Sequence, residues 1–163
     1  KRIMEFSLGV GLAASGVGIC MGIAAIGAGI GVGIAGAAGA GVIAEDPKKF
    51  GSVLVLQALP QTQGIYGFLG AILIMIGTGI LGTPIEVSTP LGLICLGAGV
   101  SMGLGGITAI GQGITAGACM GAVAKRPESF GQGMVLSVMS ETFAVFALLI
   151  LILILVGTKV LGG

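Results

Sequence analysis

One carboxylate, Glu141, lies inside a long apolar stretch of the sequence. It is the only charged residue between Glu128 and Lys159. A charged side chain at the centre of a bilayer costs about 2.5–3.5 kcal/mol on insertion scales. A chain that carries such a group usually uses it to bind or move an ion. Glu141 is therefore the first candidate for the chemistry of this protein.

A second group of polar residues lies in an apolar segment of the first half. Its members stand at i, i+3, i+4 and i+7, which places them on one helix face: Leu59, Thr62, Gln63 and Tyr66. Pro60 has no N–H, so the carbonyl of Leu56 loses its partner and a kink is expected. Gln112 lies deep in another apolar segment. Oxygens of these types suit a hard cation, although Thr and Gln can also simply join helices by hydrogen bonds.

The composition is that of an integral membrane protein. Hydrophobic residues make up 55% of the chain and charged residues 8%, against roughly 25% charged in soluble domains. The net charge of +1 gives no reason to expect nucleic acid as a partner. The three cysteines lack CxxC spacing and are expected to be small buried hydrophobes: Cys20, Cys95 and Cys119.

The charged residues divide the chain into four apolar spans, each longer than the roughly 20 residues that one membrane crossing needs. We predict an all-α membrane protein with four long helices, at 6–44, 50–81, 89–124 and 129–160. The alternation of apolar and polar residues that is typical of a membrane barrel is absent. The chain begins at Lys1 rather than Met, and a signal peptide is not expected because the first apolar run is too long.

The polar loops predict an orientation. Loops 45–49 and 125–128 contain Lys or Arg, whereas the connection 82–88 contains neither. Because basic loops are retained on the cytoplasmic side, the first and third loops are expected in the cytoplasm. The connection 82–88 and both termini are then expected outside.

The chain is an internal duplication with a shift of 80 residues. Equivalent residues include Pro47 and Pro127, Phe50 and Phe130, and Thr62 and Thr142. The predicted units are two helical hairpins, 1–82 without a membrane carboxylate and 83–163 with Glu141. Gln61 occupies the position in the first hairpin that Glu141 occupies in the second.

Glycine is concentrated in the first and third spans, with 34 glycines in the whole chain. Small residues let helix backbones approach closely in membranes. The second and fourth spans contain larger side chains. This asymmetry predicts a tight inner layer of the first and third helices and an outer layer of the other two, and many copies could pack this way into a ring.

The stretches 56–68 and 139–144 resemble the proteolipid subunit, called c or K, of bacterial V-type rotary ATPases, and most closely the sodium-translocating kind. The resemblance covers essentially the whole chain. It implies a homo-oligomeric rotor ring that carries Na⁺, with H⁺ as the alternative. The implied ion ligands are Glu141, Thr62, Gln63, Gln112 and the Leu59 carbonyl, with Tyr66 locking the site. Proton-translocating members of the family share the glutamate but lack the Thr-Gln-Tyr set, which favours Na⁺ here. Gln61 departs from the sodium-translocating pattern, in which a small residue is expected at this position.

The resemblance also implies partners and a mechanism. A Glu141 neutralised by a cation can pass through lipid at far lower cost than an ionised one. The family supplies a stator membrane subunit with an arginine, a central stalk and a soluble ATPase head. Loops 45–49 and 125–128 are expected to contact the stalk or to be ordinary solvated turns. The chain is not expected to be an enzyme on its own, and the remaining alternatives are a self-contained four-helix channel or transporter and a purely structural membrane protein.

Overall fold

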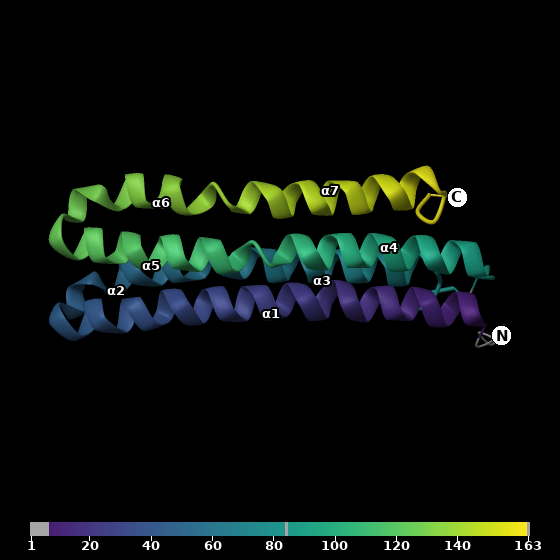
Figure 1. Cartoon of the computed structure of the whole chain (residues 1–163), viewed down its shortest axis with the longest axis horizontal. Helices are drawn as coiled ribbons and strands as arrows, with labels where there is room; N and C mark the ends of the chain where they lie inside the picture. Colours follow the sequence, from purple (N-terminus) through teal and green to yellow (C-terminus); the bar gives the residue numbers. More distant parts are fainter. Residues whose placement is uncertain (1–6, 84, 163) are drawn as a thin grey trace.

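The chain folds into four long helical rods that run side by side (Figure 1). The computed structural model describes residues 7–83 and 85–162. In chain order the elements are α1 (Leu8–Glu45), η1 (Pro47–Lys49), α2 (Phe50–Ala58), η2 (Leu59–Gln61), α3 (Thr62–Gly77), α4 (Thr89–Gly106), α5 (Ala109–Lys125), η3 (Pro127–Ser129), α6 (Phe130–Val138) and α7 (Glu141–Gly157).

Each rod is long and apolar enough to cross a membrane. The four candidate spans are Leu8–Glu45, Pro47–Gly77, Thr89–Lys125 and Pro127–Gly157. The 38 residues of α1 extend over about 57 Å, against a hydrocarbon core of about 30 Å, so this helix projects beyond the bilayer. The predicted all-α fold with four membrane helices is confirmed.

Two predicted helix ends were wrong. The second and fourth helices end at Gly77 and Gly157, not at residues 81 and 160. Beyond these points the backbone turns to positive φ, 68° at Gly79 and 57° at Lys159, a conformation that ends a helix. Pro47 and Pro127 each open a 3₁₀ turn, so helical structure begins slightly earlier than predicted. The predicted start of the first helix, residue 6, lies outside the described residues.

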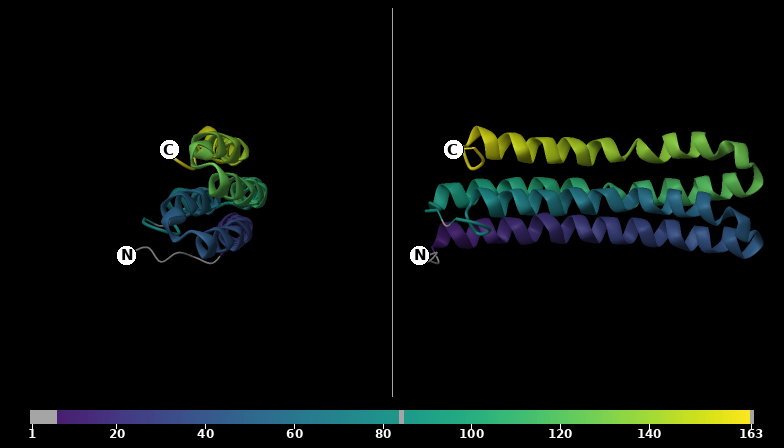
Figure 2. Two further views of the ribbon diagram at one scale, coloured as in Figure 1. Left: turned by 90° about the vertical axis from the view of Figure 1, so that its left-hand side faces the viewer. Right: turned by 180° about the vertical axis from the view of Figure 1, so that it is seen from behind.

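The two hairpins join mainly through α1 packed along α4 and α5, and the end-on view in Figure 2 shows the four rods as one bundle. Glycines bring these backbones together. A methyl group on Gly99 would collide with the Gly16 carbonyl, and one on Gly113 would collide with the Gly31 carbonyl. The predicted tight layer of the first and third spans is confirmed. On the outer side, α7 packs against α4 and α3.

Replacement of Gly113 by Ala should destabilise the bundle. The added methyl would overlap the backbone of Gly31, and overpacking of this kind typically costs about 1–3 kcal/mol. Gly41→Ala is the matched control, because a methyl there would meet nothing within 4 Å and alanine favours a helix. Thermal unfolding in detergent should show a lower midpoint for the first variant only. Equal midpoints would contradict the close contact.

Candidate functional site

Three of the four rods are interrupted near their middles. The 3₁₀ turn η2 contains Pro60, α4 gives way to α5 at Ile107–Thr108, and α6 gives way to α7 at Met139–Ser140. The irregular backbone between α4 and α5 and between α6 and α7 is visible about midway along the ribbons (Figure 1). Non-helical backbone at membrane depth is tolerated where protein buries it or where it lines a cavity. The interruptions therefore mark the depth at which a site is expected.

Only the interruption at Pro60 was predicted from the sequence. At the other two, a hydroxyl bonds back to the preceding turn. Thr108 Oγ1 donates to the Gly105 carbonyl at 2.8 Å, and Ser140 Oγ donates to the Ser137 carbonyl at 3.4 Å. Such bonds offer the backbone an alternative to the helical pattern.

Glu141, at the first position of α7, is held by two donors from other rods. Tyr66 Oη, from α3, donates to Glu141 Oε1 at 2.5 Å. Gln112 Nε2, from α5, donates to Glu141 Oε2 at 3.3 Å. The carboxylate is thus fixed between both hairpins.

The amides and the hydroxyl continue the network into the first hairpin. Gln63 Nε2 donates to Gln112 Oε1 at 2.5 Å. Thr62 Oγ1 lies 2.9 Å from the Leu59 carbonyl and 3.1 Å from Gln63 Oε1, and can donate to either oxygen. The structure therefore brings all six residues singled out from the sequence into one connected cluster, which we call the oxygen cluster: Leu59, Thr62, Gln63, Tyr66, Gln112 and Glu141.

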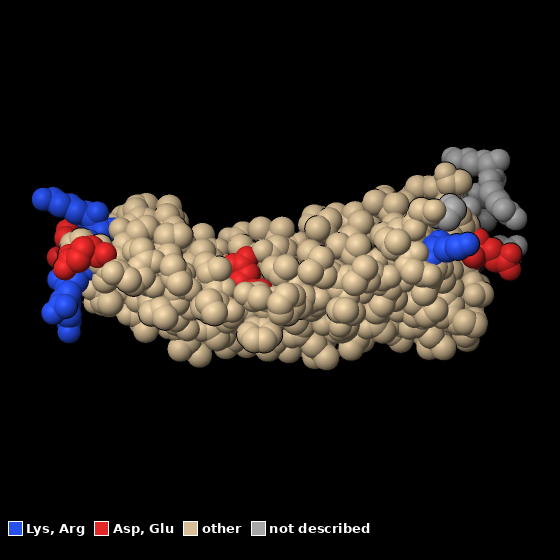
Figure 3. All heavy atoms as spheres, turned by 90° about the horizontal axis from the view of Figure 1, so that it is seen from above, with Lys and Arg blue, Asp and Glu red and all other residues tan. Residues whose placement is uncertain are grey.

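The oxygen cluster is largely shielded from the surroundings. Gln63 and Gln112 are fully buried, while Glu141, Thr62 and Tyr66 are half-buried. Figure 3 shows charged side chains gathered at the two ends of the molecule and one acidic patch about midway along an otherwise uncharged face. Every buried side-chain N or O atom in the described part of the chain has a hydrogen-bond partner. The cluster is thus a satisfied polar network in an apolar body.

The oxygen atoms of the oxygen cluster are suited to bind a small hard cation. The cluster offers a carbonyl, a hydroxyl, two amide oxygens and one carboxylate, and oxygen ligands of these kinds favour hard ions over soft metals. The single carboxylate matches the charge of a monovalent cation. Among the described residues, no group of three or more His, Cys, Asp or Glu side chains is placed to hold a metal ion.

Sequence reasoning missed the residues that position Gln112. Its neighbour Gly113 lies against Gly31 of α1, and a methyl on Gly31 would meet the Ala109 carbonyl and the Pro60 side chain. This contact sets α5 beside η2, where Gln112 reaches Gln63. The repeated glycines of the first and third spans were the available signal, but they do not show which glycines meet.

Comparisons with known proteins bear on the family of the chain. The family model for the C subunit of ATP synthase matches the chain twice, at residues 15–74 and 96–154. The chain belongs to this ATP synthase family. The two matches fall on the two hairpins, one on each.

Two relatives are more specific. The chain is 53% identical over 146 residues to the A-type ATP synthase subunit K of Methanocaldococcus jannaschii, covering 90% of this chain and 62% of that protein. It is 37% identical over 123 residues to the V-type sodium ATPase subunit K of Enterococcus hirae, covering 75% of this chain and 76% of that protein. The predicted membership among V/A-type proteolipid subunits, which are non-catalytic membrane subunits, is confirmed.

Proposed function

We propose that the chain is a rotor subunit that carries Na⁺ through the membrane at the oxygen cluster, and that identical copies form a ring whose rotation is coupled to ATP hydrolysis or synthesis. The observation that carries the proposal is the network of oxygens from three rods around Glu141, the one carboxylate that the described part of the chain places midway along a rod. The family and the names of both relatives support the coupling to ATP hydrolysis or synthesis.

Sodium is favoured over protons by the oxygens beyond Glu141. Protonation of a carboxyl needs no further ligands, whereas a cation stripped of water needs several. Here the Thr62 hydroxyl and the Gln63 amide stand in one chain of contacts with the carboxylate. The Enterococcus hirae relative is named as a sodium ATPase subunit. A rotor subunit that carries H⁺ is the second candidate.

In this mechanism the hydrogen bonds hold the carboxylate in place while its charge state decides whether a copy in the ring can move. Tyr66 and Gln112 fix the two oxygens of Glu141. When a cation is bound, the site is neutral and the subunit can face lipid at low cost. When the site is empty, the ionised Glu141 makes contact with lipid energetically costly. A stator membrane subunit with an arginine would supply the polar surroundings in which the ion enters and leaves the site. A central stalk would transmit the rotation to the soluble ATPase head.

The orientation and the division of the chain are part of the proposal. Loops 45–49 and 125–128 face the cytoplasm and reach the stalk, while the connection 82–88 and both termini lie outside. The hairpins 1–82 and 83–163 act as one unit, because the oxygen cluster takes Tyr66 from the first and Glu141 from the second.

Sodium should protect Glu141 from modification by a hydrophobic carbodiimide. The reagent attacks the protonated carboxyl, so a bound cation that displaces the proton removes its target. We expect the labelling rate of the purified oligomer to fall as Na⁺ is raised at fixed pH. Potassium at equal ionic strength is the control. If the labelling rate depends on pH alone and Na⁺ has no effect, the ion carried is H⁺ and not Na⁺.

A further inference from the structure

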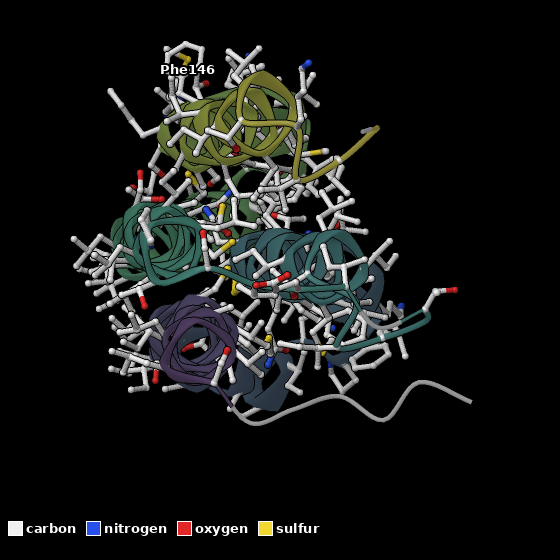
Figure 4. All side chains as sticks on the ribbon, turned by 90° about the vertical axis from the view of Figure 1, so that its right-hand side faces the viewer. Phe146 is labelled. Atoms are coloured by element: carbon white, nitrogen blue, oxygen red, sulfur yellow. The ribbon has the colours of Figure 1, made fainter. Side chains whose placement is uncertain are left out.

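The two halves of the fourth rod are held unequally. The half α7 packs against both α4 and α3. Its Leu151 and Leu155 are fully buried, while Phe146 points away from the other rods (Figure 4). The half α6 packs mainly against α5 and has little contact with α2. The buried residues of α6 are Gly133 and Ser137, which make far fewer van der Waals contacts than leucines do, so α6 is the more weakly anchored half.

A break in the helix separates these two halves. Met139 and Ser140 lie in a turn between α6 and α7, and the bond from the Ser140 hydroxyl to the Ser137 carbonyl is long at 3.4 Å. A short non-helical stretch within a helix often marks a hinge. A segment with few packed contacts also opens at lower cost than one with many. We therefore expect α6 to move about this hinge more readily than α7, which begins with Glu141.

Polar side chains of the second and fourth rods lie on one side of the oxygen cluster. We call the end of the molecule at loops 45–49 and 125–128 the loop end. Between the cluster and the loop end, α2 and α6 contain polar side chains: Ser52, Gln57, Gln132 and Ser137. Toward the opposite end, residues 67–77 and 143–157 contain none. Because an ion in apolar surroundings is strongly disfavoured, the route to the loop end is the easier one.

We infer that η3 and α6 together form a gate, residues 127–138, through which the ion reaches the oxygen cluster from the loop end. The gate turns at Met139 and Ser140 and separates from α5, while α7 keeps the opposite side closed. Glu141 stays bonded to Tyr66 of α3 during this movement, because neither residue belongs to the gate. The inference rests on the proposed function, since it assigns the path by which the carried ion enters and leaves.

A disulfide between the gate and α5 tests the inference with one substitution. A Cβ built on Gly133 lies 3.0 Å from Cβ and 3.4 Å from Sγ of the native Cys119. A small shift brings this pair to the Cβ spacing of a disulfide, about 3.5–4.5 Å. Oligomers of Gly133→Cys are oxidised, loaded with isotopic Na⁺ and transferred to unlabelled Na⁺. We expect release about tenfold slower than after treatment with a membrane-permeant reductant, with the equilibrium affinity for Na⁺ unchanged, because the bond blocks opening and leaves the ligands in place.

Gly70→Cys is the matched control. A Cβ built on Gly70 lies 3.1 Å from Sγ of the native Cys20. The same oxidation therefore links α3 to α1, on the opposite side of the oxygen cluster from the gate. Release of Na⁺ should be equal before and after reduction. The unsubstituted chain, whose cysteines are free and buried, shows the effect of the oxidant alone.

Substitution at the hinge tests the gate without a disulfide. Ser140→Ala removes the hydroxyl bond to Ser137 and favours a continuous helix, whereas Ser140→Gly disfavours one. Release of Na⁺ should be slower in the alanine variant and faster in the glycine variant than in the unsubstituted chain. The two variants should differ by about fivefold, which corresponds to the difference in helix propensity between alanine and glycine. Equal release from both would contradict a hinge at this position.

Hydrogen exchange on the assembled oligomer tests the gate independently of the ion. Backbone amides of α6 should exchange faster than those of α7, and the disulfide of oxidised Gly133→Cys should slow the amides of α6. Equal protection of the two helices would overturn the gate, as would unchanged Na⁺ release with the disulfide verified by mass spectrometry. Failure of every variant and of the unsubstituted chain to bind Na⁺ would refute the proposed ion, and the amides of α6 would still decide whether the gate opens.

Discussion

Replacement of Glu141 by Gln should abolish ion-coupled ATPase activity in the assembled complex. The amide keeps the size of the side chain and can still accept a bond from Tyr66, which lies 2.5 Å from the carboxylate. It has no charge to offset a cation, and a cation in an apolar body without its counter-charge is strongly disfavoured. We expect ion transport to fall to background and carbodiimide labelling of this chain to disappear.

Glu86→Gln is the matched control for this variant. Glu86 is exposed in the connection between the hairpins, far in sequence from the oxygen cluster, and the chemical change is the same. The control should transport ions normally. Normal transport by the Glu141 variant, with folding verified by unfolding temperature, would remove the carboxylate from the mechanism.

Replacement of Gln63 by Leu should weaken sodium binding by a factor of ten or more. The change removes one candidate ligand and takes away the donor to Gln112 Oε1, which lies 2.5 Å from Gln63 Nε2. A polar contact to a charged group contributes about 1.5–3 kcal/mol, so loss of the Gln63 oxygen from the ion's surroundings is enough for this effect, since about 1.4 kcal/mol is a factor of ten in affinity. Thr62→Val, which nearly preserves shape, should act in the same direction through the lost hydroxyl.

The measurement is isotopic Na⁺ binding to the isolated oligomer, together with the Na⁺ concentration that halves carbodiimide labelling. Gln132→Leu is the control, because it makes the same change on the exposed side of α6. Labelling without Na⁺ should be retained in all these variants, since Glu141 remains. An unchanged Na⁺ requirement in both Gln63→Leu and Thr62→Val would show that these oxygens do not bind the ion.

Local patterns in the sequence predicted much of the site. Thr62, Gln63 and Tyr66 were placed on one face by helical spacing alone, and the hydrogen bonds of all three lie on that side. Pro60 predicted the interruption that became η2. These features depend on residues within two turns of each other, where backbone geometry leaves little choice.

The helix ends at 77 and 157 and the interruptions at Ile107–Thr108 and Met139–Ser140 were not predicted. Apolar residues continue on both sides of Gly77 and of the two interruptions, so hydropathy gives no boundary there, and the charged Lys159 places the last helix end only to within a few residues. The ends depend on backbone that turns to positive φ, as at Gly79 and Lys159. The interruptions accompany hydroxyl bonds whose formation depends on packing.

The sequence by itself determined that there are four apolar spans in two repeated halves and that only the second half has a carboxylate inside an apolar span, because charge, hydropathy and repetition are properties of the residues themselves. Only the tertiary structure decided that Gln112 meets Gln63 and that Tyr66 meets Glu141. Those partners are 49 and 75 residues apart. Their meeting requires the glycine contact between α1 and α5 to set the depth of the rods, and relative depth is a property of packed backbones that no single helix contains.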